Sequence, residues 1–515
     1  MWRALAALVL ILVLGSRPAR AEWIRAESPN FILYSQADEA RVREQIRMIE
    51  DFNWLLRWTT GARAPRSPNK LNVYMVRGLH QLRQVRPGIG DGVGGFYTAQ
   101  PTGIAVFADE RVNFGDNPSD TRLQTTFHEY THHFMMQYFP VAYPAWYVEG
   151  FAEYMMNARV RGQTIEFGGI ARDRALALTS SNSWLNMERF LFEPQALTND
   201  ETMKFYAQSW IMVHYMLSDP TRRARMQDYL AAYARGEDPR AAFETAFRMR
   251  PAELMFELRR YIRGGIPATR LTRNDPPSEI PISVTRLPES ADRLLLLDAG
   301  MMIGLDHEFV RSHVARVRRA AAAFPEDDFA RRVLARAEAF YGDGEAADRL
   351  LGPMLAAAPN DAELLYFSGI RELNAAHSAN DLARARRAQA FFARARRANP
   401  NHVPNLVAYA QSLEQEPDFV SQNTTDILLT AYRLAPQVVP ITLSASRMLI
   451  DRREFSQAEA MLAPVAADYH ADSFTDTARG LIAQARAQSR AAGGPPNQEN
   501  GRSAPRRLFQ PPRRR

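Results

Sequence analysis

The 515-residue sequence contains no cysteine. This absence excludes disulfide bonds, a thiol nucleophile, thiolate-bound zinc and iron–sulfur clusters, and it removes the acylated cysteine of a bacterial lipoprotein. Imidazole and carboxylate groups remain as strong metal ligands. Any metal site in this protein must therefore be built from histidine, aspartate and glutamate side chains.

Long hydrophobic runs are also scarce. The apolar run at residues 4–15 has twelve residues, whereas a membrane-spanning helix takes ~20. Arg3 precedes this run and an A-x-A cleavage site follows it at residues 19–21, which is the pattern of a secretory signal. We therefore expect a signal peptide at residues 1–21. The mature protein is expected to begin at Glu22, to be periplasmic or secreted rather than a lipoprotein, and to have no integral membrane segment.

The net charge of +7 is confined to the two ends of the chain. Residues 1–21 carry +3 and residues 487–515 carry +6, which leaves the body with a net charge of −2. A nearly neutral body lacks the basic face that binds phosphates, so we expect no nucleic-acid binding. The basic stretch 487–515 is predicted to be a disordered tail.

The length exceeds one usual hydrophobic core of ~250–300 residues and predicts at least two domains. Residues 22–112 alternate short strand patterns, at 30–34 and 71–76, with a helix at 38–58 that ends before a glycine, and they predict an α/β part. Residues 113–263 predict a helical part of the same domain, with helices at 121–138, from 145 onward, and at 202–218, 220–235 and 238–263. Pro239 and Pro251 are expected at helix starts. The Pro- and Thr-rich stretch 264–289 is predicted to be a linker.

Residues 290–486 have an internal helical period. Prolines end helical runs at intervals of 34, 41 and 36 residues, at Pro325, Pro359, Pro400 and Pro436. This spacing resembles the 34-residue tetratricopeptide repeat. The resemblance implies an all-α solenoid whose concave groove binds a protein partner, and an unrelated helical array is the alternative.

The clearest chemical motif is the H-E-x-x-H at residues 128–132. On a helix, residues four apart lie ~40° apart around the axis, so His128 and His132 can reach one metal ion from the same face. Glu129, beside the first histidine, can accept a proton from water next to the metal without ligating it.

The helix expected after Pro144 contains Glu149 and, one turn later, Glu153. Catalytic zinc takes three protein ligands and leaves one position open, and a helix that returns after the turn can supply the third ligand. The spacing suits one ligating carboxylate and one that accepts a hydrogen bond from a ligand imidazole. The alternative is two solvated glutamates on an amphipathic helix.

The H-E-x-x-H followed by W-x-x-E-G-x-A-E-Y resembles the gluzincin metallopeptidases, in particular their peptidase-MA-like branch of secreted bacterial proteins. The resemblance covers about residues 22–263. It implies an α+β zincin-like metallopeptidase domain with Zn²⁺ as its cofactor. The roles implied are zinc ligand for His128, His132 and Glu149, general base for Glu129, and hydrogen-bond partner of a ligand imidazole for Glu153.

Two further residues of this region bear on the resemblance. Tyr206 lies in a segment similar to the tyrosine-bearing helix of gluzincin aminopeptidases, which implies that its phenol stabilises an oxyanion; plain helix packing is the alternative. His133 departs from the family, which usually has an uncharged residue there, and we expect a structural role for it.

These observations predict a secreted zinc-dependent peptidase that hydrolyses peptide or protein substrates, with a solenoid that recruits the substrate or a partner. If the solenoid only recruits, removal of residues 290–515 should leave the chemistry on small peptides intact. The alternative is a non-catalytic, zinc-stabilised scaffold that acts through its tetratricopeptide solenoid.

Overall fold

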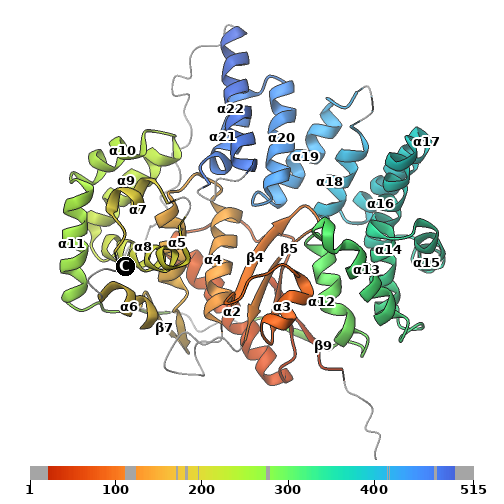
Figure 1. Ribbon diagram of the computed structural model, residues 1–515, viewed down its shortest axis with the longest axis horizontal. Helices are drawn as coiled ribbons and strands as arrows, with labels where there is room; N and C mark the ends of the chain where they lie inside the picture. Colours follow the sequence, from red (N-terminus) through yellow and green to blue (C-terminus); the bar gives the residue numbers. More distant parts are fainter. Residues whose placement is uncertain are drawn as a thin grey trace, which may run out of the picture.

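A computed structural model describes residues 21–110, 123–169, 172–179, 184–194, 197–273, 279–414, 416, 418–468 and 473–492. The predicted signal peptide, except Ala21, and most of the predicted basic tail lie outside these residues, as does the expected start of the helix at 121. The described chain is a mixed α/β structure with an N-terminal sheet and a helical C-terminal part (Figure 1). No described helix is both long and apolar enough to span a bilayer.

The N-terminal part is organised around a six-stranded sheet with the order β4-β5-β3-β2-β1-β9. The strands β2, β3 and β5 are parallel, and the remaining pairs are antiparallel. The strand patterns at 30–34 and 71–76 are confirmed as β2 and β3. The bounds are β1 Ile24–Glu27, β2 Phe31–Ser35, β3 Leu71–Val76, β4 Gly95–Gln100, β5 Gly103–Asp109 and β9 Ser283–Arg286.

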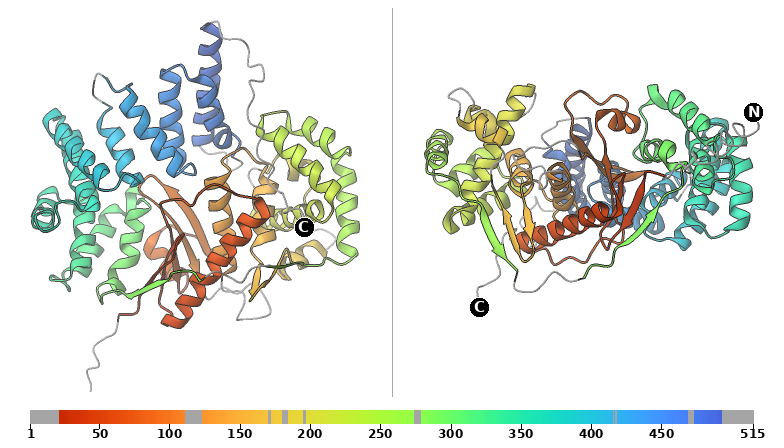
Figure 2. Two further views of the ribbon diagram at one scale, coloured as in Figure 1. Left: turned by 180° about the vertical axis from the view of Figure 1, so that it is seen from behind. Right: turned by 90° about the horizontal axis from the view of Figure 1, so that it is seen from below.

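One long helix, α2 (Glu39–Thr60), packs against this sheet (Figure 2). The Asp38 side chain accepts a hydrogen bond from the Arg41 N–H at the start of the helix, and Gly61 ends it in the left-handed conformation with φ 67°. The helix at 38–58 and its terminal glycine are therefore confirmed. A shorter helix, α3 (Leu79–Val85), follows β3.

The segment after the sheet is mainly helical, as predicted. Residues 238–263 form two helices rather than one continuous helix, and the predicted helix starts at Pro239 and Pro251 are confirmed. Arg248 adopts a left-handed backbone with φ 55°, and Pro251, which has no N–H to donate, begins the next helix. The bounds are α4 Gln124–Tyr138, α5 Ala145–Met155, β6 Arg159–Arg161, β7 Thr164–Phe167, α6 Arg172–Thr179, α7 Met187–Phe192, α8 Asn199–Leu217, α9 Pro220–Ala234, α10 Pro239–Phe247 and α11 Pro251–Arg263.

Residues 264–289, predicted to be a linker, contain two strands that belong to the N-terminal part. β8 (Thr269–Thr272) pairs with β7, and β9 pairs with β1 in the register Ile24↔Arg286. Both strands contain β-branched residues that suit an extended edge strand. The chain therefore joins both the six-stranded sheet and a second, three-stranded sheet of order β6-β7-β8 on its way to the C-terminal helices.

The C-terminal helices form an arc around the β4–β5 end of the sheet (Figure 1). Helices α15, α17 and α19 end close to Pro359, Pro400 and Pro436, where the sequence places helix ends. The bounds are α12 Ala291–Met302, α13 His307–Ala321, α14 Asp328–Tyr341, α15 Gly344–Ala357, α16 Ala362–Ala379, α17 Leu382–Ala398, α18 Val403–Ser412, α19 Gln422–Leu434, α20 Val439–Asp451, α21 Phe455–Ala466 and α22 Ser473–Ala491.

The arc packs on the sheet rather than standing apart from it. Leu295 and Leu296 of α12 share a buried cluster with Tyr74 and Phe107 of the sheet. A Cβ atom at Gly103, the first residue of β5, would lie 2.5 Å from the Met302 side chain, so the end of α12 packs closely on the start of this strand. Part of the inner side of the arc is therefore covered by the chain's own sheet, and the predicted solenoid groove stays a prediction.

Candidate metal site

Helices α4 and α5 bring His128, His132 and Glu149 together. The two Nε2 atoms of His128 and His132 are 3.1 Å apart. Glu149 Oε2 lies 3.4 Å from His128 Nε2 and 3.6 Å from His132 Nε2. These three atoms come from the residues that the sequence places at ligand spacing, and they form a group able to hold a metal ion.

The size of this triangle fits zinc. Tetrahedral zinc with nitrogen and oxygen ligands at 2.0–2.2 Å requires ligand atoms ~3.3–3.5 Å apart. The three observed separations, 3.1, 3.4 and 3.6 Å, average close to that value. Two imidazoles and one carboxylate also form a donor set of a kind that leaves a fourth position open in catalytic zinc sites.

Close helix packing positions Glu149. Pro144 precedes the first residue of α5, so the chain re-enters a helix directly after the turn that follows α4. Gly150, the glycine of the W-x-x-E-G pattern, lies against α8, and a Cβ there would be 2.3 Å from the Ser209 carbonyl oxygen. Any larger residue at 150 would push α5 away from α8 and would displace the neighbouring carboxylate.

The electrostatics of the cluster favour a proton on His128 when no metal is present. Burial opposes protonation, but the adjacent Glu149 carboxylate outweighs it and raises the pKa of His128 to about 9. Burial likewise opposes ionisation of Glu149, yet the neighbouring imidazoles hold its pKa well below the ordinary value. The metal-free cluster is therefore held together by the same groups that would ligate a cation.

We expect zinc binding at pH 7 to release about one proton, because zinc requires the neutral imidazole of His128. The pKa of His128 is raised in the metal-free fold, so its protonation contributes to the free energy of unfolding. This contribution is complete below pH ~6.5, and it is lost as the pH rises through about 9. Zinc affinity should accordingly increase about tenfold per pH unit between pH 7 and 8. Calorimetric titration in two buffers of different ionisation heat measures the released protons, and an affinity that does not change with pH would contradict the assignment.

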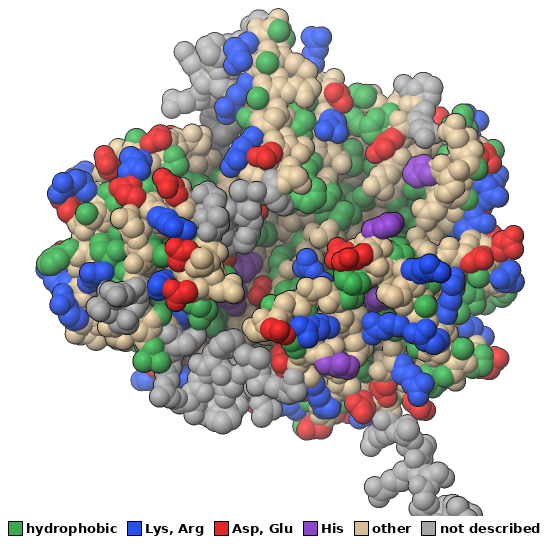
Figure 3. Space-filling model, viewed as in Figure 1, with side chains coloured by type: hydrophobic (Ala, Val, Ile, Leu, Met, Phe, Trp, Pro, Cys, Tyr) green, Lys and Arg blue, Asp and Glu red, His purple; other side chains and the backbone are tan. Residues whose placement is uncertain are grey.

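Glu129, the predicted base, follows His128 directly on α4 and is half-buried. Its negative charge is close enough to Tyr206 to contribute to the pKa of that phenol. The pKa of Tyr206 is raised chiefly by the charge of Glu149, then by burial, and further by Glu153 and Glu129. The structure therefore groups Glu129 with the predicted ligands on one side of α4, where Figure 3 shows a hollow with histidine and acidic side chains inside it.

Glu153 lies one turn beyond Glu149 and approaches the other nitrogen of His128. Its Oε1 atom is 3.6 Å from His128 Nδ1, which is longer than a direct hydrogen bond. Both carboxylate oxygens accept hydrogen bonds from Arg174, from Nε at 2.9 Å and from Nη2 at 3.0 Å. Glu153 is therefore fixed in place by an arginine on α6.

Arg174 is a site residue that the sequence did not reveal. It is 8% exposed, and its guanidinium carbon lies 5.5 Å from the centre of the Tyr206 ring. The Tyr206 ring centre is in turn 6.3 Å from that of His128. Arg174 thus links two predicted site residues, yet it is 21 positions beyond Glu153 and belongs to no recognisable motif.

Replacing Arg174 with Gln should weaken zinc binding by about 10–100-fold, the usual cost of losing a group that orients a metal ligand. Glu153 would lose both of its charged hydrogen bonds and would no longer hold a fixed position beside His128. Arg270→Gln is the matched control, because that side chain is 72% exposed. Competition with a zinc-binding dye measures both affinities, and equal values would rule out an orienting role.

The other histidines of this region have structural surroundings. The Nδ1 atom of His133 lies 3.1 Å from the hydroxyl of Tyr97 on β4, and burial lowers the pKa of His133 to about 3. His214 is buried on α8, with its ring nitrogens 2.9 Å from the Tyr261 hydroxyl and 3.2 Å from the Pro267 carbonyl. Neither belongs to the metal-ligand triangle.

Comparison with known proteins identifies neither a family nor a function for the chain. No protein-family model matches the chain, and no curated protein matches it. The chemical interpretation of the site therefore depends on its geometry and on its motif.

Proposed function

We propose that this protein is a secreted or periplasmic zinc-dependent peptidase of the gluzincin type. The proposal includes a zincin-like N-terminal domain and a tetratricopeptide-like arc. One observation supports it above all: the two histidines of the H-E-x-x-H and Glu149 present three ligand atoms 3.1–3.6 Å apart. Glu129 adjoins the first of these ligands on the same helix.

When bound, zinc supplies a Lewis acid that polarises the scissile carbonyl and makes water more acidic. Glu129 accepts the proton of the attacking water and passes it to the leaving amine. Tyr206, whose raised pKa keeps its phenol protonated at neutral pH, donates a hydrogen bond to the oxyanion that develops on the substrate. Arg174 fixes the Glu153 carboxylate beside His128 Nδ1, and the charge of this carboxylate favours the tautomer with a proton on Nδ1 and Nε2 free to ligate.

The scaffold alternative is less favoured for two reasons. Its binding surface would be the inner side of the arc, which packs against β4, β5 and the turn between them. A scaffold would also have no use for a carboxylate at position 129. The arc therefore has at least a structural role, because part of its inner side packs on the sheet.

Zinc analysis of the mature protein tests the proposed site. We expect about one zinc ion per chain in the wild type and almost none in His132→Ala, because two remaining ligands bind zinc far more weakly than three. The melting temperature should fall as well, since the ligands join α4 to α5. His214→Ala is the control, because this histidine is buried but lies outside the triangle. Equal zinc content in wild type and His132→Ala would exclude the site.

A further inference from the structure

Helix α4 has a second face that the proposed function does not use. His133 and Gln137, one turn apart on this helix, lie ~140° and ~180° around its axis from His128. Both residues border a cavity of about 460 Å³ between the sheet and the arc. Groups that contact this face can therefore set the position of α4 without touching a metal ion.

Two hydrogen bonds join this face to the rest of the molecule. The Tyr97 hydroxyl on β4 lies 3.1 Å from Nδ1 of His133, and the two rings meet edge-on with centres 5.6 Å apart. Nε2 of Gln437, in the turn before α20, donates to Oε1 of Gln137 at 3.0 Å. Gln437 is 7% exposed and His133 is 9% exposed, so each bond is largely shielded from competing water. We call these four residues, Tyr97, His133, Gln137 and Gln437, the α4 clamp.

The start of α4 is fixed by close packing on the same strand. A Cβ atom at Gly95, the first residue of β4, would lie 2.6 Å from the Thr125 side chain. Thr125 is the second residue of α4, so β4 contacts the helix at its start as well as at the clamp. The clamp is therefore left to fix the second half of the helix, which contains His132.

The arc presents Gln437 from a fixed position beside the sheet. Ala99 of β4 and Ile104 of β5 pack against the buried cluster of the last arc helices, which includes Val438 next to Gln437. Strand β4 contacts both α4 and α20. A shift of the arc would therefore act on α4 through Gln437 and also through the strand that carries Tyr97.

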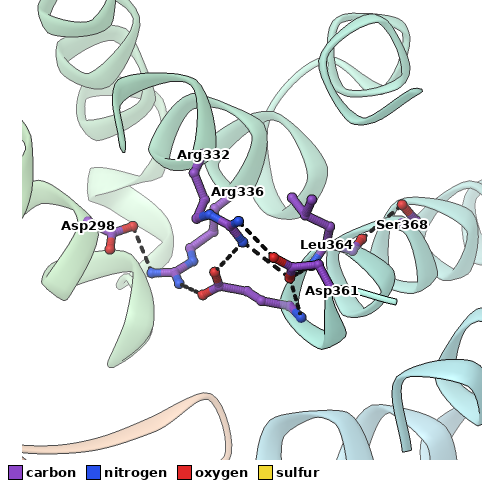
Figure 4. A network of polar contacts seen from close by, with 7 residues as sticks. Asp298, Arg332, Arg336, Asp361, Leu364 and Ser368 are labelled. Carbon is purple, nitrogen blue, oxygen red and sulfur yellow. Dashed lines mark hydrogen bonds and ion pairs between the residues drawn. The ribbon is translucent and has the colours of Figure 1, made fainter. Parts of the chain in front are cut away.

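An ion-pair network stiffens the arc where it joins the sheet. Arg336 of α14 bonds to Asp298 of α12 at 2.7 Å and to Glu363 of α16 at 2.6 Å (Figure 4). The Arg336 side chain is only 14% exposed, and removing one partner of such a buried pair is strongly destabilising. Helix α12 in turn packs on Tyr74 and Phe107 of the sheet. The arc and the sheet therefore form one framework against which α4 is placed.

We propose that the arc is a positioning element of the metal site and acts through the α4 clamp. The inference rests on the metal site of the proposed function. His132 directly precedes His133, so a displacement of the clamped half of α4 moves the His132 imidazole relative to Glu149 on α5. Zinc requires ligand atoms ~3.3–3.5 Å apart, and a displaced imidazole therefore binds it less tightly.

Competition with a zinc-binding dye on the full mature protein tests the clamp. We expect Gln437→Leu and Tyr97→Phe to bind zinc about three- to tenfold more weakly than wild type, an effect typical of residues that act through others. Gln422→Leu and Tyr432→Phe are matched controls on α19 and should keep the wild-type affinity. Gln422 is exposed, and the Tyr432 hydroxyl forms no hydrogen bond with a described residue. Melting temperature checks that each variant is folded.

A double variant separates the clamp from a general loss of stability. If Gln137 and Gln437 act through their shared hydrogen bond, Gln137→Leu combined with Gln437→Leu should weaken zinc binding no more than the larger single effect. Effects that multiply would overturn the inference, because the two side chains would then act independently. Clamp variants that fold and bind zinc as tightly as wild type would overturn it too, as would controls that weaken binding equally.

Hydrogen exchange of the metal-free protein gives a readout that does not depend on zinc. Amides of α4 should exchange faster in Gln437→Leu than in wild type, while those of α11, which packs on α7 and α8, should not change. Unchanged exchange in α4 would overturn the inference even if the wild type binds zinc. Faster exchange in α4 together with a wild type that binds no zinc would contradict the proposed function and leave the positioning of α4 by the arc supported.

Discussion

Glu129→Gln should lower the rate of peptide hydrolysis by about 10²–10⁴, the usual effect of removing a positioned general base. The substitution preserves the shape of the side chain but removes the carboxylate that accepts the proton from water. Zinc should stay bound, because the ligand triangle consists of His128, His132 and Glu149 and does not include Glu129. The measurement is turnover at matched zinc occupancy.

Glu244→Gln is a suitable control for this comparison, since Glu244 is exposed on α10. It makes the same chemical change at a position away from the ligand triangle and should leave turnover at the wild-type level. If Glu129→Gln and wild type hydrolyse the peptide equally fast, the observed cleavage takes place elsewhere. A loss of zinc from Glu129→Gln would instead mean that Glu129 supports the metal.

A chain that ends at residue 289 should fail to fold cooperatively. Removal of α12 would uncover Trp23, Tyr74 and Phe107, which are at most 4% exposed and pack against Leu295 and Leu296. Exposing three large apolar side chains costs about 5–9 kcal/mol, which is comparable with the whole stability of about 5–15 kcal/mol of a typical domain. On this ground we expect the opposite of the prediction from sequence, in which removal of residues 290–515 leaves hydrolysis of small peptides intact.

Thermal melting followed by circular dichroism tests this point. A chain that ends at Ala492 retains every described helix and should melt like the full protein. The shorter chain should show a broad transition and bind a hydrophobic dye. A sharp melt within a few degrees of the full protein, together with retained peptide cleavage, would mean that the arc is dispensable.

Local signals explain what the sequence predicted well. A capping aspartate and a terminal glycine mark α2, and short runs rich in apolar and aromatic residues mark β2 and β3. The predicted metal ligands on α4 need only the helical period, because His128 and His132 are one turn apart. Glu149 follows after a short turn whose prolines end one helix and begin the next. Each of these features depends on neighbours within about 20 residues.

The features that were missed depend on distant partners. Strand β9 pairs with β1 about 260 residues away, and nothing in its own residues identifies that partner. The apolar face of α12 predicts burial but does not say that Tyr74 and Phe107 cover it. Arg174 reaches Glu153 only after the chain has formed a hairpin between them. Side-chain pairing and packing across such separations are decided by the whole fold.

The central claim is zinc-dependent peptide hydrolysis at the His128, His132 and Glu149 cluster. A peptide-library digest analysed by mass spectrometry tests it most directly, with the mature protein in zinc-loaded, chelator-treated and zinc-restored forms. We expect cleavages in the first form, their loss in the second and their return in the third, with His132→Ala inactive throughout. Cleavages that persist after chelation, or no cleavage of any peptide by the fully zinc-loaded protein, would contradict the account.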